Sequence, residues 1–400
     1  MKTKKLFEED VMRRSCEATV QACNPCKDGF RIVLDQTVFF PEGGGQLSDC
    51  GVLKRGNTQM EVVHVSEHDG LVYHETKQPL EVGTLVTCQL NWPVRFDHMQ
   101  QHCGEHMLSY AFWKLCGADN VGFHMHPDMV SIDLNREVTR EEAMAAEAMT
   151  NQAIEEDRPI HVEVMPAERA AERPLRKFND KLKGLLRIVS VEGNDSCTCC
   201  GTHPPTTGMV GLVKILKVER HKGGSRISFL CGREALQKID VWLQAAQDVS
   251  NQLSVKEEEI ASSVARLLAE KKELHAQITA LTDRLLDHEL RELDMKPSFD
   301  QEGHRKLIFV RDELTPQQAK VLARKMLERE NTIAAVFYHH GERINYIVSS
   351  TAAEVNCQQR IKAINDCLQG RGGGRPDSCQ GSAPWKEGWQ QLVTGLANAW

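Results

Sequence analysis

The sequence predicts an α+β protein in four consecutive parts. Three observations predict it. Short β-type runs separated by Gly, Asn and Asp fill residues 12–92. Residues 233–296 contain neither Gly nor Pro. Strand-like and helix-like segments alternate after Pro297. The expected parts are a β-barrel-like domain (1–93), an α+β domain (94–232), a coiled coil or helical hairpin (233–296) and an α/β domain (297–400).

The composition indicates a folded protein outside the membrane. The 400 residues are 41% hydrophobic, which is enough to bury several cores and excludes a chain that is disordered overall. No apolar run approaches the roughly 20 residues that cross a bilayer, and the N-terminus lacks the apolar stretch of a secretory signal. We therefore expect a soluble, cytoplasmic protein with no membrane partner. Its 14 cysteines are expected to be reduced thiols or metal ligands.

The net charge of −7 argues against a protein that coats nucleic acid indiscriminately. Two local runs of basic residues nevertheless have few acidic neighbours. They are either solvated faces or the sides of a groove that follows a phosphate backbone. The runs consist of Arg169, Arg173, Arg176, Lys177, Lys181, Lys183 and Arg187, and of Lys214, Lys217, Arg220, Lys222 and Arg226.

The N-terminal part has β-type runs at 30–34, 60–65 and 84–90, which favour a small barrel or sandwich. A glycine-rich segment, Phe39-Phe-Pro-Glu-Gly-Gly-Gly-Gln46, interrupts them. By itself it is typical of a hairpin turn, because it has neither the Gly-Lys-Ser/Thr ending nor the Gly-x-Gly-x-x-Gly spacing of nucleotide-binding loops.

The middle part begins with a predicted helix over 93–116, where Pro93 suits the first helical turn. A second helix is predicted over 139–156, because Thr139-Arg-Glu-Glu142 is a capping box. Two β-type runs follow at 185–191 and 227–230.

Residues 233–296 carry a heptad pattern. Glu257 and Lys271 interrupt its alternate row. The pattern favours a coiled coil or long hairpin, with a homodimer formed through this segment, and the alternative is an amphipathic helix packed on its own domain. The first row is Leu253, Ile260, Leu267, Leu274 and Leu281, and the alternate row contains Val264, Ile278 and Leu285.

The last part is predicted to alternate between strands and helices. We expect strands at 306–310, 333–338 and 344–349, and helices at 315–330 and 352–369.

A metal site is predicted from two distant segments. His102 and His106 are four residues apart in a predicted helix, so both imidazoles can reach one cation. Cys199 and His203 lie in Cys197-Thr-Cys-Cys-Gly-Thr-His203. Three imidazoles and a thiolate suit Zn²⁺, which we expect at one ion per chain. On spacing alone, Cys197 or Cys200 could replace Cys199.

These motifs together resemble the alanyl-tRNA editing proteins of the AlaX family in their long form, which are free-standing relatives of the alanyl-tRNA synthetase editing domain. The resemblance rests on 39–51, on Arg95-Phe-Asp-His-Met-Gln-Gln101 followed by His-x-x-x-His, and on Cys-x-Gly-Thr-His. Residues 122–124 and 131–134 fit the segment between the two ligand pairs. The glycine-rich stretch 370–381 resembles the synthetase's C-terminal (DHH-associated) domain.

The resemblance implies a zinc-dependent hydrolase that removes the wrong amino acid from tRNA(Ala), foremost Ser-tRNA(Ala) and also Gly-tRNA(Ala). It implies that Gly44, Gly45, Gln46, His124 and Thr202 bind substrate. An alternative from another class is a non-catalytic, zinc-stabilised tRNA-binding or assembly protein, which the four-ligand set and the heptads favour.

Two departures from the family pattern lie beside the predicted ligands. Glu105 stands where the family often has Gln, and Pro204-Pro205 follows His203 where the family usually continues with Val. Glu105 is the candidate catalytic residue, as a base or as a contact for the substrate amine. The alternative is a solvated helix carboxylate.

Overall fold

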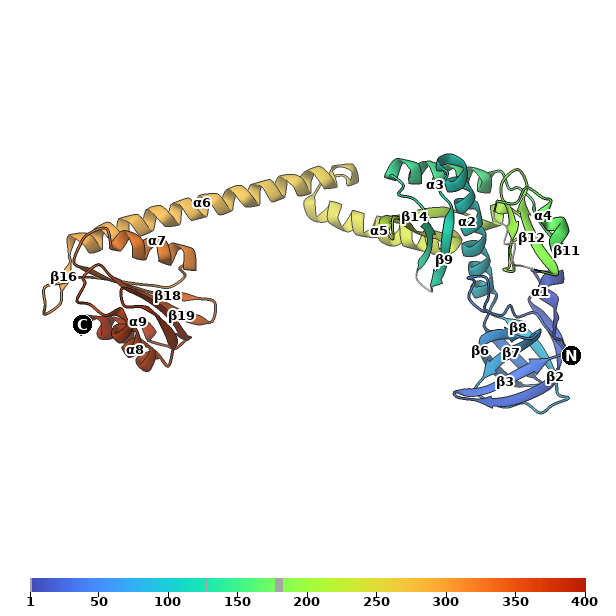
Figure 1. Cartoon of the computed structure of the whole chain (residues 1–400), viewed down its shortest axis with the longest axis horizontal. Coiled ribbons are helices and arrows are strands. Elements are labelled where there is room, and N and C mark those ends of the chain that lie inside the picture. The colour runs from blue at the N-terminus through green and yellow to red at the C-terminus, as the bar shows by residue number, and fades with distance from the viewer. Residues whose placement is uncertain (1, 127–128, 177–182) are drawn as a thin grey trace. The chain divides into compact units, whose positions relative to one another are not determined.

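The structure is a computed structural model, and it describes residues 2–126, 129–176 and 183–400 (Figure 1). Of the basic residues named above, Lys177 and Lys181 lie outside the described residues. The chain divides into two compact units, Met1–Gln252 and Leu253–Trp400. The mixed α+β class is confirmed, and the four-part division stays a prediction.

The first unit begins with a closed six-stranded barrel, in the order β2-β3-β7-β6-β5-β8, with every neighbouring pair antiparallel. Side chains alternate between a filled interior and solvent, as β8 shows with every second residue buried. Of the two predicted forms, the structure is thus a barrel. The strands are β2 (Ser15–Cys26), β3 (Gly29–Leu34), β5 (Gly51–Arg55), β6 (Thr58–His68), β7 (Leu71–Thr76) and β8 (Leu85–Leu90), with β1 (Lys4–Lys5), β4 (Gln36–Thr37) and α1 (Leu6–Glu9) beside them.

A long helix, α2 (Trp92–Cys116), follows the last barrel strand (Figure 1). Pro93 lies in its first turn, as predicted, and Gly117 ends it in a left-handed conformation. Most of the stretch from Met99 to Phe112 is buried, because α3 (Arg140–Glu155) and a sheet pack around it. The capping box of α3 is formed as predicted: Glu142 N–H donates to Thr139 Oγ1, and Thr139 N–H donates to the Glu142 carboxylate.

Two further sheets complete the first unit. A four-stranded sheet has the order β14-β15-β10-β9, and a three-stranded sheet has the order β11-β12-β13. The apolar core lies between α2, α3 and these sheets. The elements are β9 (Asn120–His126), β10 (Met129–Leu134), β11 (Ile160–Pro166), α4 (Ala167–Ala171), β12 (Leu185–Val191), β13 (Ser196–Thr198), the short 3₁₀ helix η1 (Thr207–Val210), β14 (Val213–His221), β15 (Gly224–Cys231) and α5 (Gly232–Leu253).

The second unit is built on a six-stranded sheet in the order β16-β17-β18-β19-β21-β20, in which only the β17–β18 pair is parallel. Helices pack on the sheet and bury two apolar clusters. The elements are η2 (Glu257–Glu259), α6 (Ile260–Met295), β16 (Ser298–Phe299), β17 (Arg305–Arg311), α7 (Pro316–Met326), β18 (Thr332–His340), β19 (Arg343–Ser350), α8 (Cys357–Leu368), β20 (Arg371–Arg375), β21 (Ser378–Pro384) and α9 (Trp389–Asn398).

The heptad segment is not one continuous helix. α5 ends at Leu253 and α6 begins at Ile260, with Ser254 at a left-handed φ of 53° between them. The first heptad row is therefore divided after its first residue. Within the second unit, Leu286 of α6 packs against α7 and β17, while Leu274 and Leu281 are exposed. The coiled coil itself stays a prediction.

The glycines at 372–374 form strand β20. A Cβ on Gly372 or Gly374 would lie 2.4 or 2.3 Å from backbone atoms of β21, so these positions need glycine for strand pairing. α7 and α8 are shorter than the predicted helices at 315–330 and 352–369. Within the described residues, no helix is both long and apolar enough to cross a membrane.

Candidate metal centre

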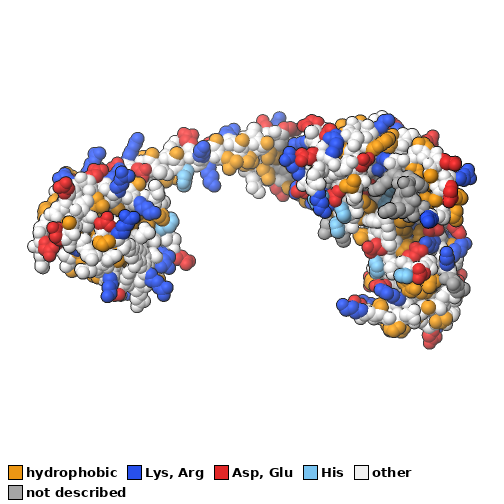
Figure 2. Space-filling view, viewed as in Figure 1, with side chains coloured by type: hydrophobic (Ala, Val, Ile, Leu, Met, Phe, Trp, Pro, Cys, Tyr) orange, Lys and Arg blue, Asp and Glu red, His pale blue; other side chains and the backbone are white. Residues whose placement is uncertain are grey.

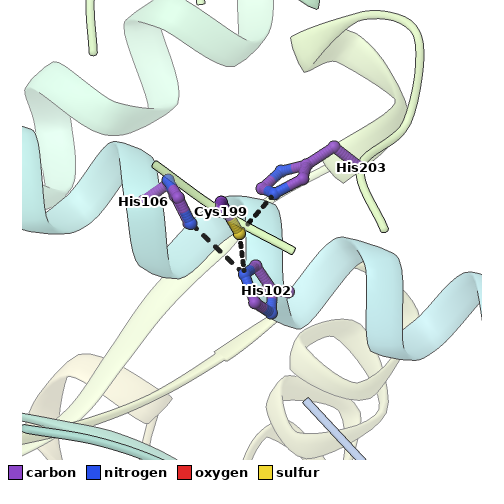
Figure 3. A group of neighbouring side chains, drawn as sticks. All are labelled: His102, His106, Cys199 and His203. Atoms are coloured by element: carbon purple, nitrogen blue, oxygen red, sulfur yellow. Dashed lines mark hydrogen bonds between the residues drawn. The ribbon is translucent and has the colours of Figure 1, made fainter. Parts of the chain in front are cut away.

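The two predicted ligand pairs meet in the first unit. His102 Nε2 lies 3.2 Å from His106 Nε2 and 3.1 Å from Cys199 Sγ, and His203 Nε2 lies 3.3 Å from the same sulfur (Figure 3). These four donor atoms all lie within 4.8 Å of one another. The two α2 histidines approach from one helical face, and the loop after β13 brings the other two residues (Figure 3).

Hydrogen bonds to its backbone fix the loop that carries Cys199. Arg187 of β12 donates from Nη1 to the carbonyl oxygens of Cys199 and Gly201, at 3.0 and 2.7 Å. Gly201 N–H donates to Cys199 Sγ at 3.3 Å. A Cβ on Gly201 would lie 2.6 Å from His102 Cε1, so only glycine lets the loop approach the α2 histidines so closely. After His203, Pro205 accepts a hydrogen bond from Ile160 N–H, which joins this loop to β11.

The electrostatics of the cluster favour a thiolate. Burial alone would raise the pKa of the Cys199 thiol, but His102, His106 and His203 beside it lower the pKa well below its ordinary value. Burial lowers the pKa of His203 to about 3, whereas at His106 burial is outweighed by the neighbouring Cys197, Cys199 and Glu105, which raise the pKa well above its ordinary value.

The donor set fits a tetrahedral zinc ion. Zinc bonds of about 2.0–2.3 Å place neighbouring ligand atoms about 3.3–3.7 Å apart. The two nitrogen–sulfur contacts of 3.1 and 3.3 Å and the nitrogen–nitrogen contact of 3.2 Å are close to these separations. His102 and His203 are each nearly fully buried, and their Nδ1 atoms have no hydrogen-bond partner among the described residues. Three imidazole nitrogens and a cysteine sulfur converging in a buried position match the ligand chemistry of Zn²⁺.

The two alternative sulfurs lie elsewhere. Cys197 is buried with its Sγ 3.0 Å from His106 Nδ1, on the opposite side of that ring from the cluster. Cys200 lies against the glycine-rich loop, since a Cβ on Gly44 would be 2.6 Å from its sulfur. Cys199 is thus the cysteine that joins the three Nε2 atoms.

The glycine-rich loop borders the cluster. Gln46 donates from Nε2 to Thr202 Oγ1 at 2.8 Å, and Thr202 N–H donates to Gln46 Oε1 at 2.9 Å. Gly44 and Gly45 have φ of 61° and 83°, and a Cβ on Gly45 would lie 2.5 Å from Phe123, whose ring packs edge-on against His102. Gly44, Gly45, Gln46 and Thr202 therefore gather beside the four-residue cluster.

A buried ion pair connects this loop to α2. The Arg95 guanidinium contacts the Asp49 carboxylate through Nε and Nη2, and both side chains are almost wholly excluded from solvent. Asp49 also accepts from Phe40 N–H, and Arg95 donates to Val38 O at 2.7 Å. The helix with the histidines is thereby held against both ends of the loop.

Glu105 is not a solvated helix carboxylate. It is 6% exposed, and its Oε1 accepts from Ser109 Oγ at 2.7 Å and from Asn120 Nδ2 at 2.6 Å. Its Oε2 lies 3.8 Å from His106 Nε2. The carboxylate is therefore oriented toward the cluster by two neutral donors.

His124 does not join the cluster. Its Nε2 lies 3.2 Å from Asp133 Oδ2, and Asp133 is also bound by Arg226. Successive residues of a strand point to opposite faces, and on β9 it is Phe123 that faces His102. The predicted substrate contact of His124 thus has no support from this geometry.

Many residues of the two basic runs are neutralised locally. Figure 2 shows Lys and Arg side chains intermixed with Asp and Glu over the visible face. Arg187 supports the Cys199 loop instead of lining a groove. The ion pairs are Arg173–Glu163, Arg176–Asp195, Lys214–Glu147, Lys217–Glu219, Arg220–Glu137 and Arg226–Asp133.

Sequence reasoning missed Asp195 and the local contacts of Arg176 and Arg187. Asp195 lies four residues before Cys199, but an isolated Asp in a Gly-Asn-Asp turn carries no recognisable signal. The roles of the two arginines depend on strand pairing between β11, β12 and β13. The contact between Ser109 and Glu105 could have been predicted, because residues four apart on one helix are neighbours.

Three parts of the chain match known families. Residues 4–94 match class II (A) tRNA synthetases, residues 186–228 match the second additional domain of threonyl and alanyl tRNA synthetases, and residues 304–398 match the DHHA1 domain. The second match includes Cys199 and His203.

Individual relatives cover nearly the whole chain. The alanyl-tRNA editing protein AlaX-L of Pyrococcus horikoshii is 28% identical over 385 residues, which are 94% of each chain. The alanine–tRNA ligase of Pyrococcus abyssi is 29% identical over 95% of this chain, which spans only 42% of the ligase. The C-Ala domain of Aquifex aeolicus alanyl-tRNA synthetase aligns with 26% of this chain and 96% of its own, at 22% identity and a TM-score of 0.23, which is too low to support an argument.

Proposed function

This chain is a relative of the long-form AlaX alanyl-tRNA editing proteins, and on that premise we propose that it hydrolyses, in trans, the ester of tRNA(Ala) charged with the wrong amino acid. The proposed substrates are Ser-tRNA(Ala) first and Gly-tRNA(Ala) second. The observation that carries the proposal is the convergence of His102, His106, Cys199 and His203 next to the Gln46–Thr202 contact and the buried Glu105.

We further propose that one zinc ion is held by His102, His106, Cys199 and His203. When bound, it would supply Lewis-acid polarisation or an oriented contact for the aminoacyl group. The nitrogen and sulfur donors of this set support zinc over Mg²⁺ or Ca²⁺, which prefer oxygen ligands.

The chain's own residues would position the ester. The left-handed glycines Gly44 and Gly45 expose backbone on the side of the cluster, and Gln46 and Thr202 lock the loop in that position. Glu105 would accept a hydrogen bond from the substrate ammonium or from the attacking water through Oε2, since Ser109 and Asn120 already occupy Oε1. An aminoacyl ester is already activated, so orientation supplies much of the rate increase.

The test is deacylation of Ser-tRNA(Ala) and Gly-tRNA(Ala) by the zinc-loaded chain, with Ala-tRNA(Ala) as the matched control. We expect turnover on the two mischarged tRNAs, sparing of Ala-tRNA(Ala), and loss of activity after removal of the metal by a chelator. Zinc added back should restore the activity, whereas Mg²⁺ should not. Equal rates on all three tRNAs would contradict an editing role.

The non-catalytic alternative rests on one observation: four protein donors converge, as in closed structural zinc sites. In that case the chain would retain tRNA without ester loss over many equivalents of substrate. Multiple-turnover kinetics therefore separate the two functions.

A further inference from the structure

Of the three histidines in the cluster, His106 alone has a polar contact at Nδ1 within the described part of the chain. Cys197 Sγ lies 3.0 Å from this nitrogen, and Asp195 Oδ2 lies 3.7 Å from it. The Nδ1 atoms of His102 and His203 have no such partner among the described residues. His106 thus has supports that the other two lack.

Asp195 is a firmly held, buried anion. It is 2% exposed and accepts two hydrogen bonds from Arg176, at 2.8 Å from Nε and 2.7 Å from Nη2. The backbone on either side is also fixed, because Val191 N–H donates to Asp195 O and Arg176 N–H donates to Ser196 O. The Arg176 side chain is itself only 9% exposed. A two-point arginine contact fixes the plane of the carboxylate as well as its position.

We propose that Asp195, anchored by Arg176, is a positioning residue for His106. Asp195 Oδ2 and Cys197 Sγ both lie against the Nδ1 side of the ring, at 3.7 and 3.0 Å, and thereby hold His106 so that its Nε2 faces His102 and Cys199. Ligating histidines commonly donate their second N–H to a carboxylate, which fixes the orientation of the ring. The inference rests on the proposed function only in taking the cluster to be the metal site.

An Arg–Asp ion pair can serve folding alone. The Arg176–Asp195 pair differs because its carboxylate lies beside Nδ1 of His106, whose Nε2 belongs to the cluster. A similar trio lies in the same unit without that connection. Arg226 binds Asp133 at 2.6 and 2.8 Å, and His124 Nε2 lies 3.2 Å from Asp133. Asp133 is therefore a matched control for Asp195.

The experiment measures zinc affinity of the full chain by competition with a chromogenic chelator, in the absence of tRNA. Asp195→Asn is expected to weaken zinc binding about 10–100-fold, while Asp133→Asn stays within about twofold of the unchanged chain. Nitrogen NMR of the zinc-loaded protein should show a changed His106 ring signal in Asp195→Asn only.

Cys197→Ala separates the sulfur from the carboxylate, and we expect it to weaken zinc binding less than Asp195→Asn. Asp195→Asn leaves the Arg176 charge buried without a partner, which could by itself destabilise the fold. The double variant Asp195→Ser with Arg176→Leu removes both charges, so it should fold and should still bind zinc more weakly.

Undiminished zinc affinity and an unchanged His106 ring signal in a folded Asp195 variant would overturn the proposal, as would a larger loss in Cys197→Ala. A chain that binds zinc in this pattern but hydrolyses no aminoacyl-tRNA would refute the proposed function and leave the positioning role standing.

Discussion

At the scale of single residues, the four donors act as one unit. Replacing His102, His106, Cys199 or His203 by Ala should each lower bound zinc and abolish ester hydrolysis, because each Nε2 or Sγ lies at the centre of the cluster. Cys200→Ala should keep its zinc, since its sulfur lies against Gly44 instead. Zinc content by atomic spectroscopy on folded variants is the measurement. Normal zinc in Cys199→Ala together with loss in Cys200→Ala would show that Cys200 supplies the sulfur ligand.

Glu105 gives a second prediction at this scale. Glu105→Gln keeps the size of the side chain but removes the charge that faces the cluster, so we expect kcat/KM to fall by about 10–100-fold. Zinc content should be unchanged, because Glu105 is not one of the four donors. Ser109→Ala, which removes one of the two donors to Oε1 and leaves the charge in place, should cost less. Undiminished kcat/KM in Glu105→Gln would assign Glu105 a purely structural role.

At the scale of elements, the Arg95–Asp49 pair fixes α2 against the glycine-rich loop. Arg95→Met should destabilise the first unit by about 3–5 kcal/mol, because it leaves the Asp49 charge buried without a partner. The double variant Arg95→Met with Asp49→Leu removes both charges and should recover most of that loss. Urea unfolding of the three proteins measures it. A double variant no more stable than Arg95→Met would contradict this account.

Helix α6 gives a prediction about self-association. Leu274, Ile278 and Leu281 are 57%, 61% and 63% exposed, and they lie on one side of the helix at i, i+4 and i+7. A row of large apolar side chains on a charged helix is expected to pair with a second copy of the chain. Sedimentation should therefore show a dimer, and Leu274→Lys with Ile278→Lys should shift it to a monomer. Ala276→Lys, on the opposite side of the helix, is the control, and a monomeric unchanged chain would exclude the homodimer.

At the scale of the whole molecule, the two units divide the work. Every residue of the candidate centre lies in Met1–Gln252, so a chain ending at residue 252 should retain hydrolysis at saturating tRNA. The second unit contributes exposed cations such as Arg371 and Arg375 on β20, and its loss should weaken tRNA binding. Each lost phosphate contact should flatten the salt dependence by about 0.7–0.9 log units per log unit of salt. Kinetics at two salt concentrations provide the test, and a folded but inactive truncation would place part of the site beyond residue 252.

The sequence by itself determined the features that depend on neighbours along the chain. The capping box at Thr139, the helix that starts at Pro93 and the spacing of His102 and His106 follow from periods of three and four residues. The four metal-binding candidates could be predicted for the same reason, because side-chain chemistry and close spacing are local properties of the sequence. For the N-terminal strands, the sequence predicted only that they form a barrel or a sandwich. Alternation of apolar residues indicates strands, but it does not indicate whether the first and last strands pair to close a barrel.

Only the tertiary structure decided the environment of the site. Asn120 of β9 helps to make Glu105 a buried carboxylate instead of a solvated one. β-Pairing brings Arg187, from a run that looked merely basic, and Asp195, from a turn without a signal, to the cluster. The same pairing leaves His124 on the other face of β9 from Phe123. Burial and long-range contacts depend on how distant segments pack, and the one-dimensional pattern of residues does not contain that information. The physical division is thus between ligand identity, which is local, and ligand support, which comes from the fold.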